Sequence, residues 1–265
     1  MYATQKPIHQ PQKGNDMFSR ILLTLLLAST LASQAADPSL PAAKPLRALV
    51  TYGGHAFNTN AFFAVWDKLP GVTYAKCVLP QQADMLKPGL EKQFDVIVFY
   101  DMVKGFTPEQ QQAFVALLNT GIGLVPTHHT LGAHDGWREY WNIIGGHYLH
   151  KAETIGGKDY AKSCFDHGQE IAVKVVDTEH PVTRGIKDFV IHDETYGSFY
   201  VAPESHVLLT TDHPKCGHNI AWTKTYGKSR VCYLIFGHDE KAWQNANYQT
   251  LLLNAMHWAA EGSAK

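Results

Sequence analysis

The sequence has few cysteines and carries none of the short motifs that identify the commonest enzyme classes. Its four cysteines among 265 residues form no C-x-x-C pair and no zinc-finger spacing. The dinucleotide fingerprint G-x-G-x-x-G, the Walker phosphate loop, the G-x-S-x-G elbow and the H-E-x-x-H helix are all missing. These absences argue against a nicotinamide enzyme, a P-loop NTPase, an ordinary serine hydrolase and a zincin metalloprotease.

The chain also lacks an excess of charge of either sign. Lysine and arginine together number 23 and aspartate and glutamate 24, so the formal net charge is −1 at pH 7. Proteins that bind nucleic acid usually carry a strongly basic face, and we therefore expect no nucleic-acid partner. A bilayer-spanning helix needs about 20 apolar residues, and no run of that length is present. We expect no stable membrane anchor.

The longest apolar stretch lies near the N-terminus, at residues 21–32. It follows Arg20 and precedes small residues, with Ser33 and Ala35 at positions −3 and −1 of a cleavage site. This pattern is typical of a secretory signal peptide. We expect a signal peptide with an N-terminal extension over 1–35, a linker over 36–45 and a single domain over 46–265. The protein is thus predicted to be exported, and to be periplasmic or secreted.

The four cysteines fall into two groups. Cys77 and Cys232 lie in apolar runs, where a free cysteine behaves as a small hydrophobic residue. An oxidising compartment would permit a disulfide, for which Cys164 and Cys216 are the candidates.

Apolar runs alternate with amphipathic stretches along the first half of the domain. The pattern predicts strands over 46–52, 72–79, 94–100 and 122–127, with helices over 60–69, 108–118 and 137–144. Thr107 and Gln110 form a capping box at the start of the second helix. Further strands are expected over 170–176 and 206–211, then a hairpin over 219–237 and a helix over 245–261. The order predicts a flavodoxin-like, doubly wound α/β fold with a mostly parallel sheet and an added antiparallel hairpin.

Histidines gather where the predicted strands end. In open parallel sheets, ligands bind beyond the carboxyl ends of the strands. Gly54 and His55 follow the first strand, His128 and His129 follow the fourth, and His238 follows the last. We expect the three later histidines to be catalytic, and Gly54 and His55 to bind substrate. The alternatives are a simple glycine turn and a histidine pair that hydrogen-bonds only to backbone carbonyls.

Carboxylates and aromatic rings complete the candidate site. The segment 191–196 offers Asp193 and Glu194 as catalytic carboxylates, although both residues can equally form surface pairs. Asp239 is expected to bind substrate. Trp137 and Tyr140 are candidates for stacking on a sugar, with packing as a helical stripe as the alternative. The remaining histidines are expected to be incidental, among them His147, His150, His167, His206, His213 and His218.

Histidine and carboxylate together allow two kinds of chemistry. Histidine suits proton transfer near neutral pH. Several histidines with a carboxylate can also hold a divalent metal such as zinc, although the spacing here matches no known metal motif. No cysteine lies at the exit of the fourth strand, which excludes a cysteine nucleophile there.

Four segments of the chain carry a resemblance to a known family. Residues 51–63, 126–151, 180–196 and 227–243 resemble the ThuA-like, or trehalose-utilisation, family, and together they extend over nearly the whole predicted domain. The resemblance implies a class I glutamine-amidotransferase-like fold. It also implies that His128 and His129 stand where the amidotransferases have their nucleophilic cysteine. Members of this family are often cytoplasmic, so a signal peptide would be a departure.

The family is linked to disaccharide catabolism and to keto sugars. The resemblance therefore implies a carbohydrate-processing enzyme that acts on a keto sugar or a disaccharide derivative. A carbonyl acidifies the neighbouring C–H, so a base can remove that proton while a second group holds the enolate. Isomerisation or elimination follows from the same intermediate. The alternatives are a non-catalytic sugar-binding module on the same fold and a metal-dependent hydrolase.

Overall fold

Strands and helices alternate along the first half of the protein, whose computed structural model describes residues 45–262. In chain order they are β1 (Leu46–Gly53), α1 (Thr59–Trp66), β2 (Val72–Val78), β3 (Val96–Asp101), α2 (Pro108–Leu118), β4 (Gly123–Pro126) and α3 (Arg138–Ile144). The central strand β3, with the sequence VIVFYD, is buried throughout, as expected of a strand covered on both faces. The predicted signal peptide and all of the predicted linker except Pro45 lie outside the described residues.

The second half is richer in strands. It contains β5 (Gly146–His147), β6 (Glu153–Ile155), β7 (Lys158–Tyr160), β8 (Cys164–Val175), β9 (Phe189–Gly197), β10 (Tyr200–Val201), β11 (His206–Thr210), β12 (Asn219–Tyr226) and β13 (Ser229–Leu234), followed by α4 (Glu240–Trp243) and α5 (Ala246–Ala260). Four 3₁₀ turns complete the described part, namely η1 (Ala83–Met85), η2 (Leu90–Lys92), η3 (His128–Gly132) and η4 (Pro181–Thr183).

Nine of the strands form one mixed sheet, in the order β2-β1-β3-β4-β13-β12-β11-β8-β9. The first five of these are parallel to one another. Their order is the flavodoxin order, with β13 in the place of the fifth strand. The next four pair antiparallel. The α/β class, the mostly parallel core and the antiparallel hairpin β12–β13 are confirmed, while β11, β8 and β9 extend the antiparallel part beyond that hairpin.

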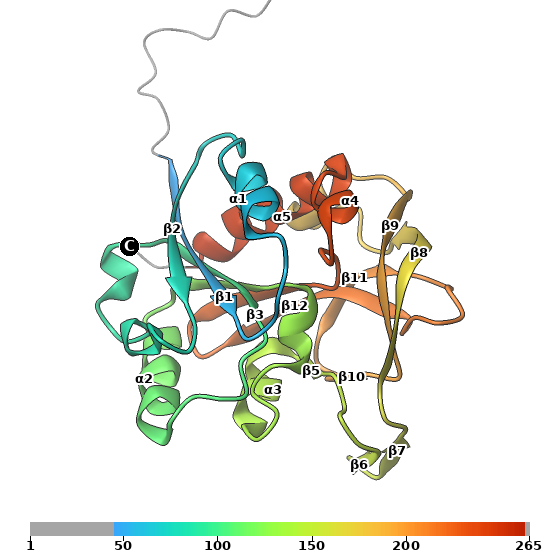
Figure 1. The fold of residues 1–265 in the computed structure, drawn as a ribbon, viewed down its shortest axis with the longest axis horizontal. Helices are drawn as coiled ribbons and strands as arrows, with labels where there is room; N and C mark the ends of the chain where they lie inside the picture. The colour runs from blue at the N-terminus through green and yellow to red at the C-terminus, as the bar shows by residue number, and fades with distance from the viewer. Residues whose placement is uncertain (1–44, 263–265) are drawn as a thin grey trace, which may run out of the picture. The chain divides into compact units, whose positions relative to one another are not determined.

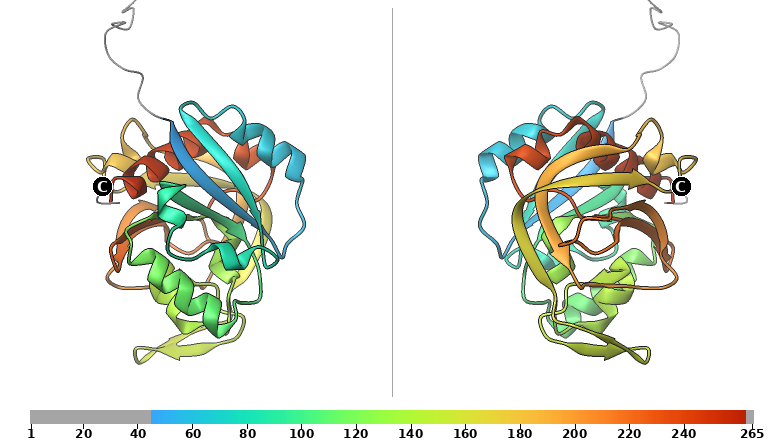
Figure 2. Two further views of the ribbon diagram at one scale, coloured as in Figure 1. Left: turned by 90° about the vertical axis from the view of Figure 1, so that its left-hand side faces the viewer. Right: turned by 90° about the vertical axis from the view of Figure 1, so that its right-hand side faces the viewer.

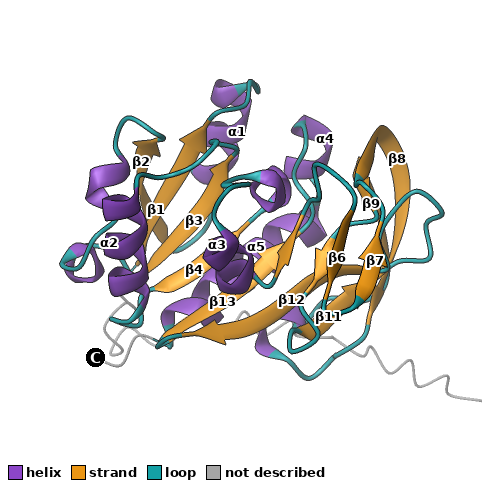
Figure 3. Cartoon of the chain, turned by 90° about the horizontal axis from the view of Figure 1, so that it is seen from below, coloured by secondary structure: helices purple, strands orange, loops and turns teal. Residues whose placement is uncertain are grey.

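Helices cover both faces of the parallel part of the sheet. Figure 1 shows α1, α4 and α5 on one side of the strands and α2 and α3 on the other. Helix α5 packs against β3, β4 and β13, and α3 packs against β12 and β13. Figure 3 shows the strands running as one layer between these helices. At the antiparallel end, β8 and β9 curve over the sheet (Figure 2), and this curvature becomes important at the site.

Local signals in the sequence placed several element ends correctly. The capping box at α2 is present, with the Thr107 side chain accepting from the Gln110 amide. Helix α3 ends at Gly145 in the left-handed conformation, and α5 is capped by Asn245. All four cysteines, which lie in the described part, are free, so the candidate disulfide Cys164–Cys216 is not formed. Within residues 45–262, no helix has the length and apolar character needed to cross a bilayer.

Candidate functional site

Five of the predicted site residues meet at the carboxyl edge of the parallel strands. His55 follows β1, His128 and His129 open the 3₁₀ turn η3 after β4, and His238 follows β13. Glu194 comes from within β9, which curves over this edge. Together they line a cavity of about 380 Å³, whose other lining residues are Met102, Gly132, Tyr148, His150, Lys162, Phe165, His167 and Tyr196.

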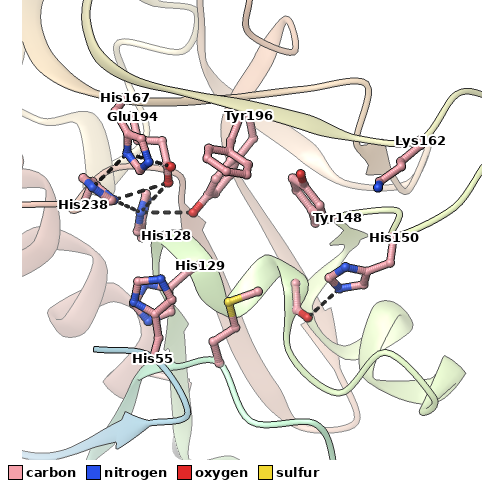
Figure 4. Close-up of a pocket in the computed structure, with 13 residues that line it drawn as sticks. His55, His128, His129, Tyr148, His150, Lys162, His167, Glu194, Tyr196 and His238 are labelled. Atoms are coloured by element: carbon pink, nitrogen blue, oxygen red, sulfur yellow. Dashed lines mark hydrogen bonds and ion pairs between the residues drawn. The ribbon is translucent and has the colours of Figure 1, made fainter. Parts of the chain in front are cut away.

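Four side chains form a connected cluster on one side of this cavity (Figure 4). Nε2 of His128 lies 3.1 Å from Oε2 of Glu194 and 3.3 Å from Nδ1 of His238. The same His238 nitrogen lies 3.4 Å from Oε2 of Glu194. Nδ1 of His167 lies 3.1 Å from Oε1 of Glu194 and 3.1 Å from Nε2 of His238. The convergence of His128 and His238 that the strand-exit rule predicts is confirmed. Glu194 joins them from the interior of β9, and the catalytic roles of all three stay a prediction.

The backbone and two tyrosines fix the His128 ring. His128 has a positive φ of 50°, an uncommon conformation for a residue other than glycine. Its Nδ1 donates to the carbonyl of Ile235 at 2.9 Å, so Nε2 is the nitrogen that faces Glu194. The Tyr196 hydroxyl lies 3.0 Å from that Nε2, and the Tyr233 hydroxyl donates to the His128 carbonyl at 2.9 Å. The ring is therefore held in one orientation.

Of the two predicted carboxylates, Glu194 faces the cavity, whereas Asp193 holds the loop that carries His238. Asp193 is buried and accepts backbone N–H groups from Gly237 at 2.7 Å and His238 at 2.9 Å. Burial raises the pKa of Asp193, although its hydrogen bonds and the charge of His128 oppose the rise. Asp193 thus anchors the loop that carries His238.

Burial and mutual contact shift the pKa values of the cluster in opposite directions. Burial alone would raise the pKa of Glu194, but hydrogen bonds from His128 and His238 outweigh it, so the net pKa is lowered. The hydrogen bond to Glu194 raises the pKa of His238 against the effect of burial. Burial lowers the pKa of His129 well below its usual value, and the neighbouring His128 lowers it further. The site therefore holds the anionic carboxylate of Glu194 beside the ring of His238, which takes up a proton easily. The ring of His129 stays neutral.

His55 and His129 form a second, less polar part of the wall. Their rings stack with centroids 4.9 Å apart. The ring of His129 also packs 4.4 Å from that of Tyr100. Among the described residues, Nε2 of His129 has no hydrogen-bond partner. Burial lowers the pKa of His55, and the positive charge of His128 lowers it further. The stacked pair thus contains a buried imidazole nitrogen without a partner among the described residues, in a ring that lines the cavity.

Gly54 and Asp239 act on the backbone rather than in the cavity. Gly54 has a φ of +72°, and a Cβ there would lie 2.3 Å from the carbonyl oxygen of Met102. Only glycine therefore lets the loop after β1 turn and carry His55 to the cavity. Asp239 caps α4 by accepting from the amides of Lys241 at 2.9 Å and Ala242 at 3.3 Å. Neither Gly54 nor Asp239 lines the cavity.

Trp137 and Tyr140 lie in the core behind the site. Both are buried, and neither lines the cavity. The Tyr140 hydroxyl donates to the Thr130 carbonyl at 3.1 Å, and Trp137 packs against Phe114. A buried ring offers no face to a sugar, so this placement corresponds to the helical-stripe alternative. The physical reason is that α3 turns this face toward the sheet.

Several lining residues were not singled out from the sequence. His150 and His167 were expected to be incidental, but both line the cavity, as do Lys162, Phe165 and Tyr196. Tyr196 had an available signal, because it lies two residues after Glu194 and so shares its face of β9. His167 had none, because it faces Glu194 only through the register shift between Asp166 and Gln169 where β8 pairs with β9.

Two groups of described residues have the donor atoms to hold a metal ion. One consists of His128, Glu194 and His238, and the other of Asp135, His147 and His150. In the second group, the carboxylate side chain is 59% exposed and Nε2 of His150 donates to the Gly132 carbonyl. The first group is the more enclosed and faces the cavity.

Comparison with known proteins places the fold and the family. A ThuA-like protein from Parabacteroides merdae is similar with a TM-score of 0.68 and 19% identity, over 84% of this chain and 92% of that one. A ThuA-like protein from Bacteroides uniformis is similar with a TM-score of 0.63 and 21% identity, over 84% and 95%. A cytoplasmic protein from Salmonella typhimurium is similar with a TM-score of 0.55 and 14% identity, over 81% of this chain and 99% of that one. At such identities the likeness shows the shared fold.

The sequence itself matches a family model. No curated protein matches the chain. The model of the ThuA family, described as trehalose utilisation, matches residues 72–259, which is more than half of the sequence. The chain therefore belongs to the ThuA family, as the four resembling segments predict.

Proposed function

We propose that this protein is an exported enzyme that processes a keto sugar or a disaccharide derivative. Membership of the trehalose utilisation family supports a carbohydrate-related role. The observation that carries the catalytic proposal is the contact of Glu194, 6% exposed, with His128 and His238 in the cavity wall. Burying a charged cluster is costly, and a module that only held a sugar would not need one.

The residues suit proton removal next to a carbonyl. His129 lines the cavity, and its buried Nε2 has no hydrogen-bond partner among the described residues, so we assign to this nitrogen the acceptance of a proton from the carbon beside the keto group. The negative charge that develops on the carbonyl oxygen is then stabilised by the protonated ring of His238, whose pKa the hydrogen bond to Glu194 raises. Elimination is completed when the glycosidic C–O bond breaks and the abstracted proton passes to the leaving oxygen. Isomerisation is completed when that proton returns to another carbon.

The opposite wall suits the rest of a sugar. Figure 4 shows Tyr148, His150 and Lys162 across the cavity from the His128 cluster. Their hydroxyl, imidazole and ammonium groups can hydrogen-bond to sugar hydroxyls. Phe165 lines the same cavity and is 54% exposed, so its ring can stack on the apolar face of a sugar. A volume of about 380 Å³ is in the range of a small-ligand site.

The test is turnover of a 3-keto disaccharide by the purified protein, with the unoxidised disaccharide as the control substrate. We expect loss of the keto sugar, and exchange of its α-proton in D₂O followed by NMR. His206→Ala is the control variant and should keep normal turnover, because His206 is exposed, pairs with Asp177 and does not line the cavity. Binding of the sugar without exchange or turnover would contradict the proposal and favour the sugar-binding module.

A further inference from the structure

We infer that Nε2 of His128, Nδ1 of His238 and Oε2 of Glu194 bind one divalent transition-metal ion, for which zinc is the best match. The fourth coordination position faces the cavity. The binding site stands on geometry alone, and only the ion's role in catalysis rests on the proposed function.

The spacing of the three atoms is that of a metal-binding face. Zinc binds histidine nitrogen and carboxylate oxygen at about 2.0–2.2 Å in tetrahedral geometry. Ligand atoms around such an ion lie roughly 3.3–3.6 Å from one another, as the edges of the tetrahedron. The three distances here are 3.1, 3.3 and 3.4 Å. One ion above this triangle can reach all three atoms with little movement of the side chains.

When both rings are neutral, the triangle brings three atoms with lone pairs together. The proton on Nδ1 of His128 is directed to the Ile235 carbonyl, so Nε2 of the neutral ring presents a lone pair. Oε2 of Glu194 presents lone pairs as well. The Tyr196 hydroxyl can donate to Nε2 of His128, but it satisfies only one corner of the triangle. A proton on His238 together with the Tyr196 hydroxyl can bridge these atoms only in pairs, whereas one metal ion contacts all three at once.

The surroundings have the features of an outer coordination shell. Histidines that bind metals usually donate their other ring N–H to a carbonyl or carboxylate, and His128 does so to Ile235. Oε1 of Glu194, the oxygen outside the triangle, lies 3.1 Å from Nδ1 of His167. Asp193 fixes the loop of His238 through two backbone amides. The ligands are 1%, 6% and 24% exposed for His128, Glu194 and His238, so the triangle is enclosed on the protein side.

The donor set selects the class of ion. Two imidazoles and one carboxylate suit zinc and its neighbours, whereas magnesium and calcium prefer oxygen ligands alone. Three protein ligands with one open position are typical of catalytic zinc sites, and two histidines with a glutamate form one of the known sets. In the proposed reaction, an ion here supplies the positive charge that the developing enolate oxygen requires.

The experiment measures metal binding directly. The purified protein is stripped with a chelator, dialysed and titrated with Zn²⁺, while metal content is measured by mass spectrometry and affinity by calorimetry. We expect about one Zn²⁺ per chain. Binding of Co²⁺ should give the visible absorption bands of a tetrahedral site. Glu194→Gln and His238→Ala should each weaken binding at least tenfold, on the scale of lost ligand support.

Asp135→Asn is the matched control, because it removes the carboxylate of the other metal-like group and should leave the stoichiometry and affinity unchanged. Circular dichroism and thermal unfolding verify that each variant folds. If Glu194→Gln does not fold, His238→Ala, at a partly exposed loop residue, provides the test. A folded protein that binds neither Zn²⁺ nor Co²⁺, or unweakened binding in both site variants, would overturn the inference. Turnover that survives in metal-free protein would also refute the catalytic role of the ion. One bound Zn²⁺ without keto-sugar turnover would leave the site standing and refute only the proposed function.

Discussion

Replacing Asp101 with asparagine should make the folded protein more stable at neutral pH. Asp101 ends β3 and is completely buried, with the Thr51 hydroxyl donating to its Oδ1 at 2.6 Å. Nε2 of His134 lies 3.8 Å from Oδ2, beyond hydrogen-bond distance. Burial lowers the pKa of His134 to about 3, so this ring carries no compensating positive charge at pH 7. The carboxylate is therefore charged at pH 7, and among the described residues it is compensated only by hydrogen bonds from the Thr51 hydroxyl and from the backbone of Val103 and Asp101.

The size of the effect follows from the pKa of Asp101. Burial raises it from 3.8 to about 6, against the opposing hydrogen bond from Thr51. Because the folded state holds this proton more tightly than the unfolded state, the free energy of unfolding falls as the pH rises from about 4 to 6, and is then constant. The loss amounts to about 3 kcal/mol at pH 7. Asp101→Asn removes this loss. The increase in the free energy of unfolding should therefore grow from near zero at pH 4 to about 3 kcal/mol at pH 7.

The assay is urea unfolding, followed by tryptophan fluorescence at pH 4, 5, 6 and 7. Wild type and Asp101→Asn should have similar stability at pH 4 and diverge as the pH rises. Thr51→Val, which removes the hydrogen bond to the carboxylate, should instead lose about 1–3 kcal/mol at pH 7. Equal stabilities of wild type and Asp101→Asn at all four pH values, or a loss at pH 7, would refute the reasoning.

Three further predictions concern the cavity and the N-terminus. His129→Asn should keep the melting temperature within a few degrees but lower turnover of the keto sugar by about 10² or more, and normal turnover would remove His129 from the mechanism. Phe165→Ala should raise KM about fivefold with kcat unchanged, while Phe165→Trp should restore it, because a ring contact contributes about 1 kcal/mol. Protein recovered from its native host should begin near Ala36, and intact Met17 would contradict export.

The parallel core was predictable because its signals are local. Apolar runs marked β1, β3 and β4, and cap residues such as Thr107 and Asn245 marked helix ends within one residue. The strand-exit rule then located His128 and His238 without any knowledge of side-chain packing, since it needs only the ends of parallel strands.

The other half of the site depended on distant pairing. Glu194 lies in the middle of β9, and its position over the cavity follows from the curvature of the antiparallel strands, which no local pattern encodes. The register shift after Asp166 brings His167 to Glu194 and likewise appears only when β8 and β9 pair. Trp137 and Tyr140 carried an ambiguous signal, because a helical aromatic stripe reads the same whether it faces a ligand or the core.

The return of β9 to the carboxyl edge of the parallel strands has a thermodynamic consequence. His128 and His238 come from the parallel half of the sheet and Glu194 from the far end of its strand order, so any ligand that joins them binds only when both halves are in place. A ligand at 100 times its Kd would stabilise that joined state by about 2.7 kcal/mol. Local opening of β8 and β9 would move Glu194 away from the two histidines and so weaken binding of the ligand. Release of the ligand and local opening of β8 and β9 are therefore linked. Hydrogen exchange in β9 should slow as the fraction of protein with bound ligand rises.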